Sequence, residues 1–313
     1  MDGMDAIRPQ WTVVPKCPAC GEALRRSCGA IQERHYVFGA EKVPTPESGI
    51  QVYACAGCAL VYKSPVPDPA FLAGVFERQM GSKWLAPQDY GAEIAALRRL
   101  CGRPDFDLLD VGAAGGDLLA ACAAAGVSGR RSALDVARYP GLERSLQGEF
   151  IEGFLDDPVL TWSGAPYDVV TAFDVLEHLA HPFVAFSNLR ALVKPGGVVL
   201  VETGNSASAW PARFGVRRWW YARLIEHHVF WSPPSLQHAA DAHGMEILQW
   251  EEVRHKSRRQ LGAAEIARDL AKQGMYRLMP DGYARFAALF GKEGNQPCSP
   301  FAKDHIRVGL RRI

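Results

Sequence analysis

Two pairs of cysteines near the start of the sequence have the spacing of metal ligands. Cys17 and Cys20 form "CPAC", and Cys55 and Cys58 form "CAGC". Four thiolates in two C-x2-C pairs match a structural zinc site, which leaves no open coordination position for catalysis. Free thiols and an iron site are the alternatives. We therefore expect a zinc-binding module, with a β-hairpin in the long stretch between the two pairs.

A second candidate site is the turn in "LLDVGAAGGDLLAACAAAG", residues 108–126. An apolar run ends on an acid, and a small-residue turn then leads into an alanine-rich segment, which predicts a strand, a tight turn and a helix start. A backbone of this kind can approach a bound nucleotide closely. The glycine spacing fits neither the dinucleotide motif G-x-G-x-x-G nor the phosphate-binding loop, which needs a following Lys-Ser or Lys-Thr. The pattern that remains is D-x-G-x-x-x-G.

This turn resembles the first motif, D-x-G-x-G-x-G, of the class I methyltransferases that use S-adenosylmethionine (SAM). Ala114 stands where the middle glycine of that motif commonly lies. Its methyl group is compatible with the turn if the local backbone keeps φ negative. The resemblance implies that SAM binds against Asp110, Gly112, Ala113, Ala114 and Gly116.

Further segments extend the resemblance in the order of that family. Asp135 and Val136 follow the second apolar run, where a carboxylate can accept hydrogen bonds from two ribose hydroxyls. In "EGFLDD", Phe154 and Leu155 would sandwich the adenine, with one of the aspartates at 156–157 near its amino group. The segment from "YDVVTAF" to "KPGGVVLVET" resembles the fourth and fifth strands of the same family. The expected cofactor is therefore SAM.

The segment "FDVLEHLAHP" carries two carboxylates and an imidazole just past the fourth predicted strand. If a helix starts near Asp174, the side chains of Asp174, Glu177 and His178 share one face. They could bind a divalent metal ion or take a proton from a nucleophile; a helix cap and packing contacts are the alternative. The spacing resembles the D/E-x-x-E-H of ubiquinone-pathway O-methyltransferases. Asp174 is also expected to contact SAM.

A stretch rich in aromatic residues and arginines runs from Trp210 to Arg223, and Glu226 and His227 follow it. It either stacks a ring and binds an anionic group of the acceptor, or packs onto the domain as an amphipathic helix. "IEHHVFWSPPSL" resembles the E-H-x-x-x-F-S segment of ketosugar C-methyltransferases, which implies that His227 is a base. It is also similar to a commoner methyltransferase pattern that indicates no particular substrate. The predicted catalytic residues are His178, His227, Glu177, Glu226 and Tyr221.

The elements that must position these residues alternate along the chain. Short apolar runs separated by helix-like segments are typical of βαβ units around a mostly parallel sheet. We predict an α/β fold with a Rossmann-like, seven-stranded, mostly parallel sheet of the class I methyltransferase type, plus a small N-terminal zinc-ribbon-like module. The predicted segments are 1–16 (tail), 17–70 (zinc-binding module), 71–104 (helical linker), 105–255 (SAM-binding domain), 256–300 (mostly helical insertion) and 301–313 (final strand).

The overall composition restricts the function further. The 313 residues carry a formal net charge of +1 and are 48% hydrophobic, which gives no bulk attraction to nucleic acid or to an anionic membrane. No window is apolar enough to span a bilayer, and a cytoplasmic protein is expected. "YACAGCALVYKSPVPDP" resembles the N-terminal module of many bacterial class I methyltransferases, including sugar C-methyltransferases. We expect a SAM-dependent methyltransferase for a small-molecule acceptor such as a sugar, nucleotide-sugar or other secondary metabolite, with an anionic or sugar-linked group. The alternatives are an RNA methyltransferase and a non-catalytic binding protein.

Overall fold

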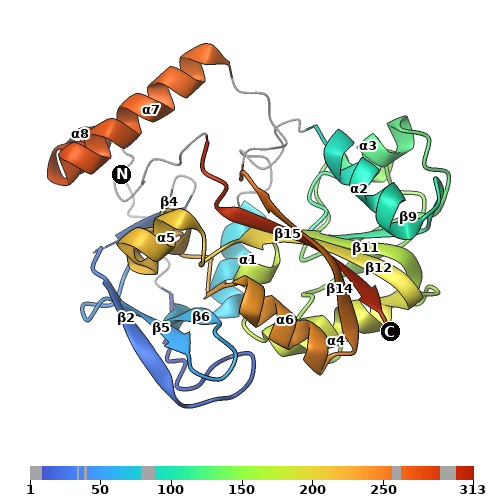
Figure 1. Cartoon of the computed structure of the whole chain (residues 1–313), viewed down its shortest axis with the longest axis horizontal. Coiled ribbons are helices and arrows are strands. Elements are labelled where there is room, and N and C mark those ends of the chain that lie inside the picture. Colours follow the sequence, from blue (N-terminus) through green and yellow to red (C-terminus); the bar gives the residue numbers. More distant parts are fainter. Residues whose placement is uncertain (1–8, 34, 39–40, 79–88, 256–261, 290–300) are drawn as a thin grey trace, which may run out of the picture.

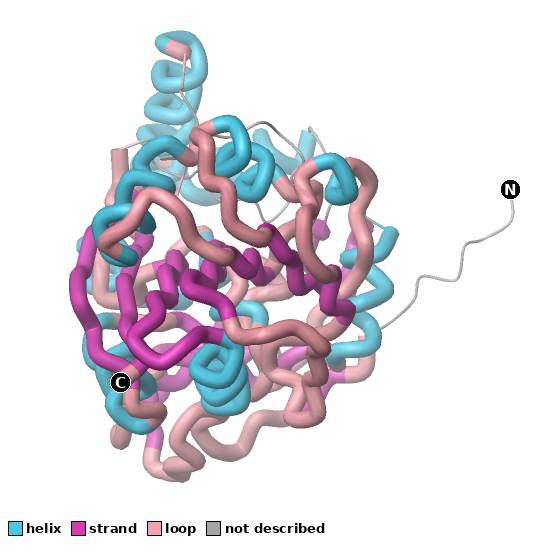
Figure 2. The backbone as a smooth tube through the Cα atoms, turned by 90° about the vertical axis from the view of Figure 1, so that its right-hand side faces the viewer, coloured by secondary structure: helices cyan, strands magenta, loops and turns pink. Residues whose placement is uncertain are grey.

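The computed structural model describes residues 9–33, 35–38, 41–78, 89–255, 262–289 and 301–313. A seven-stranded sheet crosses the molecule with helices on both faces, and smaller sheets built from N-terminal residues lie beside it (Figures 1 and 2). In the described part of the chain, we find no helix with the length and apolar character needed to cross a membrane.

The large sheet has the strand order β10-β9-β8-β11-β12-β15-β14. The pairs among the first five are parallel, and β15 is antiparallel to both of its neighbours. This confirms the predicted fold class and all seven predicted strands. Their bounds are β8 (Leu108–Val111), β9 (Arg131–Asp135), β10 (Phe150–Glu152), β11 (Tyr167–Phe173), β12 (Val193–Gly204), β14 (Met245–Val253) and β15 (His305–Arg312).

Both faces of the sheet are buried at its central strands, which is why β8 and β11 are mostly apolar runs. Leu108 and Val169 belong to the same buried cluster as residues of helices α2 (Gly91–Cys101) and α3 (Asp117–Ala124). The next residues along the two strands, Leu109 and Val170, pack instead with α4 (Pro182–Leu192) and α6 (Pro233–Ala242). Successive side chains of a strand point to opposite faces, so each face is covered by its own helices (Figure 1).

The N-terminal residues form a four-stranded antiparallel sheet of order β13-β6-β5-β2. The strand β13 comes from the later part of the chain, since Val229 pairs with Tyr62 and Phe230 with Val61. The N-terminal sheet therefore joins two of the predicted segments. Its strands are β2 (Arg25–Ile31), β5 (Ile50–Cys55), β6 (Val61–Ser64) and β13 (Val229–Phe230), and the flanking pairs are β3 (His35–Phe38) with β4 (Glu41–Pro44) and β1 (Trp11–Thr12) with β7 (Val66–Pro67).

The remaining helices lie in the predicted linker, in the insertion and around the site. Helix α1 (Pro69–Arg78) follows the N-terminal sheets, and α7 (Ala263–Leu278) and α8 (Pro280–Leu289) stand between β14 and β15 as the helical insertion (Figure 1). Parts of the predicted tail, linker and insertion, at 1–8, 79–88, 256–261 and 290–300, lie outside the described residues. The short helices are η2 (Leu142–Arg144), η3 (Leu176–His178), α5 (Ala209–Phe214), η4 (Val216–Arg218) and η5 (Tyr221–Arg223).

A buried ionic cluster connects the last strand to the rest of the sheet. Arg307 on β15 is 3% exposed and pairs with Glu202 of β12 at 2.9 Å. It also pairs with Glu93 of α2 and, at 3.3 Å, with Glu251 of β14. A guanidinium has donors for several carboxylates at once, so this one residue ties three strands and a helix together.

Candidate active site

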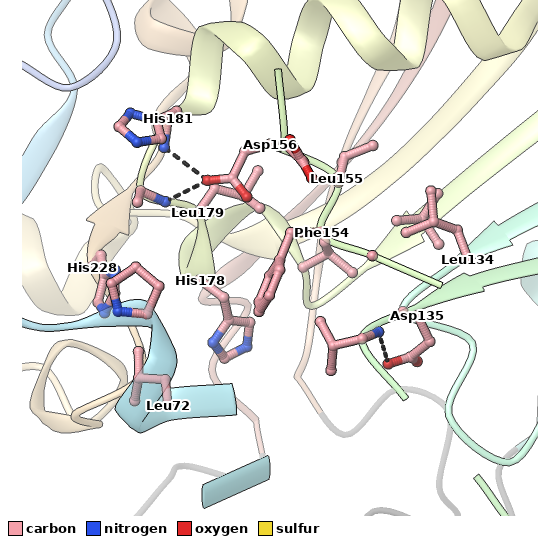
Figure 3. Close-up of a pocket in the computed structure, with 18 of the residues that line it drawn as sticks. Leu72, Leu134, Asp135, Phe154, Leu155, Asp156, His178, Leu179, His181 and His228 are labelled. Carbon is pink, nitrogen blue, oxygen red and sulfur yellow. Dashed lines mark hydrogen bonds between the residues drawn. The ribbon is translucent and has the colours of Figure 1, made fainter. Parts of the chain in front are cut away.

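A cavity of about 390 Å³ lies at the carboxyl ends of the parallel strands. Of the predicted cofactor residues, Gly112, Ala114, Asp135, Val136, Phe154, Leu155 and Asp174 line it; Asp110, Ala113 and Gly116 do not. In Figure 3, Asp135 lies on one side, Phe154 in the middle, and His178 and His228 on the other. The cavity lies where ligands bind in sheets of this type, beyond the carboxyl ends of the strands.

The turn after β8 brings backbone rather than side chains to the cavity. Gly112 has φ +70°, and a Cβ there would lie 2.6 Å from Val175 Cγ2, so only glycine fits. The condition that Ala114 keeps a negative φ is wrong, because its φ is +44°. Its N–H donates to Asp135 Oδ2 at 2.8 Å, and this bond stabilises a conformation that alanine otherwise disfavours.

Two of the residues that do not line the cavity support the turn from behind. Asp110 is buried, and its Oδ1 accepts a hydrogen bond from Thr171 Oγ1 at 2.7 Å, which fixes β8 to β11. Ala113 packs in the apolar cluster beneath α2 and α3. Asp110 and Ala113 therefore hold the turn in place and do not reach the cavity themselves.

Asp135 presents a carboxylate at the end of β9. Its two oxygens accept the N–H groups of Ala114 at 2.8 Å and Val136 at 2.7 Å. Burial raises its pKa, and backbone hydrogen bonds from Ala114, Val136 and Ala137 oppose that rise. An ionised carboxylate has about four acceptor positions, so Asp135 can still accept a hydrogen bond from a hydroxyl group of a ligand in the cavity.

The segment after β10 forms the central wall of the cavity. Phe154 is 37% exposed and Leu155 is buried, and both line the cavity (Figure 3). Asp156 Oδ2 accepts the N–H groups of Ala180 and His181, each at 2.8 Å. Asp156 therefore fixes the loop after β11, in addition to its position in the cavity wall.

The expectation that Asp174, Glu177 and His178 share one helical face is wrong. Asp174 has φ +54°, and the only helical turn there is the three-residue η3, which starts at Leu176. The ligating atoms separate into two clusters, each within 4.8 Å: Glu177, His178 and His227 in one, and Asp174, His255 and His305 in the other.

His178 is the member of the first cluster that lines the cavity. Its Nδ1 lies 3.0 Å from the carbonyl oxygen of Glu226. A carbonyl only accepts, so Nδ1 donates and Nε2 carries the lone pair. Nε2 lies 3.8 Å from Glu177 Oε1, and Glu177 Oε2 accepts a hydrogen bond from Thr203 at 2.8 Å. Such an imidazole can act as a base, with a carboxylate placed to stabilise its protonated form.

Burial decides the protonation of this pair. It raises the pKa of Glu177 to about 7, with a further contribution from the negative charge of Asp174. Burial lowers the pKa of His178, an effect that the charge of Glu226 opposes. The imidazole is therefore neutral at neutral pH and available to accept a proton.

The other predicted catalytic residues lie behind His178, on the side away from the cavity. His227 is buried, its Nδ1 lies 3.0 Å from the carbonyl oxygen of Tyr221, and its ring is 4.7 Å from that of His178. The Tyr221 hydroxyl accepts the Gly204 N–H at 3.2 Å. Glu226 is 3% exposed, and burial raises its pKa. None of these three lines the cavity; His227 and the Glu226 carbonyl contact the His178 ring from the protein side.

Two polar residues at the site were missed by the sequence analysis. His228 is 4% exposed and lines the cavity, and neither of its ring nitrogens has a hydrogen-bond partner within the described part of the chain. Burial lowers its pKa to about 3, so it is neutral. Lys63 on β6 is 2% exposed and donates to the Leu224 carbonyl oxygen; burial lowers its pKa to about 7, and Glu226 opposes this. In the sequence, His228 differs from any other histidine only by its position next to His227, and Lys63 only by its place within an apolar strand. Neither feature points to a ligand site.

The end of the aromatic and basic stretch from 210 to 223 packs inside the protein, whereas Arg213, Phe214 and Arg218 are exposed. Trp219 and Tyr221 are almost fully buried in a cluster with apolar residues of the N-terminal sheets. The indole N–H groups of Trp219 and Trp220 both donate to Asp304 Oδ2, and Arg223 pairs with Glu33. Of the two interpretations, packing onto the domain is the one that the structure supports.

The four cysteines of the C-x2-C pairs converge in the N-terminal module. Sγ of Cys17 lies 3.6 Å from that of Cys58, Sγ of Cys20 lies 3.5 Å from that of Cys55, and all four lie within 4.8 Å of one another. The Gly57 N–H donates to Cys55 Sγ at 3.3 Å. Such an amide is typical of a metal-binding knuckle, and the donor set fits a tetrahedral thiolate site.

Comparisons with known proteins agree with this geometry. The family described as "Methyltransferase domain" matches residues 77–250. A "Ubiquinone biosynthesis O-methyltransferase" of Vibrio parahaemolyticus is 38% identical over 103 residues, which are 31% of this chain and 43% of that protein. One from Xanthomonas campestris pv. campestris is 33% identical over 150 residues, or 45% of this chain and 59% of that protein. The matched region is less than two thirds of the length of either relative.

Among solved structures, the fold is similar to that of a Burkholderia thailandensis methyltransferase. That protein is a 1,6-didemethyltoxoflavin-N1-methyltransferase with bound 1,6-didemethyltoxoflavin and S-adenosylhomocysteine. The two share 14% sequence identity with a TM-score of 0.51, over 90% of this chain and 99% of that one. At this identity, the likeness is one of fold.

Proposed function

This chain belongs to the methyltransferase domain family and is a SAM-dependent methyltransferase, and from that premise we propose that it methylates a small-molecule acceptor, with His178 as the base. The observation that carries the proposal is one cavity with the Asp135 carboxylate on one side and the Nε2 lone pair of His178 on the other. In the family, SAM supplies a methyl group on a sulfonium, which is already a strong electrophile. The protein must therefore align the acceptor and remove its proton.

The cofactor half of the cavity has the features that SAM requires. Asp135 would accept hydrogen bonds from the ribose hydroxyls, and Phe154 and Leu155 would pack on the adenine. The backbone at Gly112 could approach the cofactor closely, because it carries no side chain. A Cβ there would also collide with Val175. These contacts hold the donor in one orientation relative to His178.

A second cavity supports a small acceptor. It has a volume of about 310 Å³, is lined largely by residues of the N-terminal module, and shares Pro69, Leu179, Ala180, His181 and His228 with the first cavity. Small-molecule sites have volumes of about 300–1,000 Å³. We assign the body of the acceptor to this compartment. The buried, unpartnered imidazole of His228 would then bind one of its polar groups.

The acceptor proton would move to His178 Nε2 as the nucleophile attacks the methyl carbon and the S–CH3 bond breaks. Glu177, 3.8 Å from Nε2, would stabilise the resulting imidazolium. Glu226 and His227 would keep the ring in place, Glu226 through its carbonyl and His227 through the ring contact at 4.7 Å. Because Nδ1 is already committed, the proton has only one nitrogen to occupy.

We also propose that the four cysteines bind a structural zinc ion. Because β13 belongs to the same sheet as the cysteine strand β5, zinc would fix Lys63 on β6 and His228 directly before β13. The metal would then act on the acceptor compartment without entering it. The four cysteines should hold one zinc ion per molecule in the purified chain. Cys55→Ser should lower this zinc content, whereas Cys28→Ser, outside the cluster, should not.

The test of the function is transfer of the methyl group from labelled SAM. The purified chain is incubated with catechols, nucleotide-linked sugars and transfer RNA in parallel. Label in a small acceptor, lost in His178→Asn, supports the proposal. Label only in RNA supports an RNA methyltransferase instead, and calorimetry that detects no SAM binding supports a non-catalytic protein; either result overturns it.

A further inference from the structure

A second cluster of metal-ligating side chains lies beside the cavity, distinct from the cluster that contains His178. Asp174 directly follows β11, His305 begins β15, and His255 lies two residues after β14, so three strands of the large sheet bring one side chain each to this cluster. Their ligating atoms all lie within 4.8 Å of one another. Asp174 also lines the main cavity, whereas His305 is fully buried.

The distances fit coordination of one ion. His305 Nε2 lies 3.7 Å from Asp174 Oδ1, and two ligands each about 2.1 Å from one metal ion lie roughly 3–4 Å apart. The rings of His255 and His305 are 4.8 Å apart at 35°. His305 Nε2 has no hydrogen-bond partner within the described part of the chain, although it is fully buried. A buried, unpartnered nitrogen is costly unless something binds it.

The surroundings of His305 are those of a metal ligand. Its Nδ1 lies 3.0 Å from Asp304 Oδ1, and Asp304 in turn accepts the indole N–H groups of Trp219 and Trp220. A carboxylate that accepts the N–H of one ring nitrogen directs the lone pair of the other toward the cluster. This carboxylate–histidine arrangement is held rigidly by two tryptophans.

From this geometry we infer that Asp174, His255 and His305 bind a divalent first-row transition-metal ion at the edge of the active-site cavity. Two imidazoles and one carboxylate suit such ions and leave further coordination positions open. Because Asp174 lines the main cavity, an ion held there would lie at the wall of that cavity, where the reacting group of the acceptor would meet SAM. The ion acts as a Lewis acid and needs no change of oxidation state.

The acceptor class follows from this site and rests on the proposed function. Two neighbouring oxygen atoms, as in a catechol, a vicinal diol or a hydroxyketone, fit two open positions of one ion. Coordination lowers the pKa of the attacking hydroxyl. The hydroxyl proton leaves to His178, the oxygen attacks the methyl carbon, and the S–CH3 bond pair returns to sulfur.

The test is a titration with Co²⁺, which reports coordination by visible absorption. The purified full chain first receives one equivalent of Zn²⁺ to fill the thiolate cluster. Visible Co²⁺ absorption that saturates without a thiolate-to-cobalt charge-transfer band then shows binding outside that cluster. We expect one Co²⁺ per chain. His255→Ala should weaken binding at least about tenfold, and Asp304→Asn about 10- to 100-fold, because removal of an outer-shell partner has that effect. The matched control is His238→Ala, an exposed histidine on α6.

Three outcomes would overturn the inference: no saturable binding, which leaves only an ion pair between His305 and Asp174; binding unchanged in His255→Ala; or binding lost in His178→Asn, which would put the ion in the other cluster. Thermal unfolding of each variant separates lost binding from lost folding. Because the Co²⁺ spectrum does not depend on catalysis, a negative result leaves the proposed function intact. Equal methylation of single-hydroxyl and catechol acceptors by chelator-treated enzyme would contradict the acceptor class alone.

Discussion

Replacement of His178 by asparagine should remove the base and preserve its surroundings. In the wild type, Nδ1 donates to the Glu226 carbonyl oxygen at 3.0 Å and Nε2 carries the lone pair. The asparagine amide nitrogen can still donate to that carbonyl, but nothing basic remains at the position of Nε2. We therefore expect the variant to fold and to bind SAM with unchanged affinity.

The size of the effect follows from the state of the imidazole. Burial lowers the pKa of His178, so the ring is almost entirely in its basic form at pH 7.5. The substitution should therefore remove the whole contribution of general base catalysis, about 10²- to 10⁴-fold in kcat, or roughly 3–5 kcal/mol of barrier. In wild type, kcat should fall as the pH drops through the lowered pKa, and in His178→Asn this acidic limb should vanish.

The assay is initial-rate methyl transfer to the small acceptor identified with labelled SAM, from pH 5 to 8, alongside calorimetry with SAM. His238→Asn is the matched control, because that histidine is exposed on α6 and its loss should change neither measurement. Retention by His178→Asn of more than about half of the wild-type kcat, with the acidic limb still present, would refute the assignment of His178 as the base.

Three further predictions concern stability, each measured by urea unfolding. Ala114→Gly should raise the free energy of unfolding by up to about 1 kcal/mol, because φ +44° costs alanine about 1–2 kcal/mol while glycine loses about 0.5–1 kcal/mol of chain entropy; a loss of stability would contradict the left-handed turn. For Glu177, burial raises the pKa from 4.5 to about 7, so as pH rises this carboxyl ionises in the unfolded chain before it ionises in the folded one. The wild type should therefore lose roughly 3 kcal/mol of unfolding free energy between pH 4.5 and 7. Glu177→Gln should lack this loss, and an identical pH dependence in the variant would show that the carboxyl is not desolvated. Arg307→Met should cost about 3–5 kcal/mol, because Glu93 and Glu202 stay buried without their counter-ion. Arg311→Met on the same strand is the control, and equal losses would contradict the cluster.

Much of the fold could be predicted because its signals are local. The central apolar runs of the large sheet are buried on both faces, as Leu108 and Leu109 illustrate, so strand and helix segments alternate plainly in the sequence. The two C-x2-C motifs could be assigned to one metal site, because in a reducing environment cysteines at this spacing are more often metal ligands than disulfides. These inferences need only residue types and short spacings.

The arrangement of the site depends on contacts that no short segment contains. Lys63 could not be associated with the active site, because it reaches it through β6, which pairs with β13 from a distant part of the chain. For the stretch that holds Trp219 and Tyr221, the sequence left acceptor binding and packing onto the domain as alternatives, and in the structure these two side chains pack with the N-terminal sheets. An aromatic stripe has the same sequence pattern whether it covers a ligand or another part of the protein.

The backbone at Asp174 explains why the carboxylates after β11 serve different clusters. A helix starting there would have placed Asp174, Glu177 and His178 on one face, but φ +54° turns the chain in the left-handed sense. Asp174 then lies next to His255 and His305, brought in by the last two strands of the sheet, while Glu177 is held by Thr203 next to His178. Aspartate tolerates the left-handed conformation better than most residues, and the Asp174 N–H bond to the Glu202 carbonyl oxygen at 2.9 Å holds it there. The sequence motif therefore identifies the right residues, whereas their grouping is decided by strands that lie far beyond it.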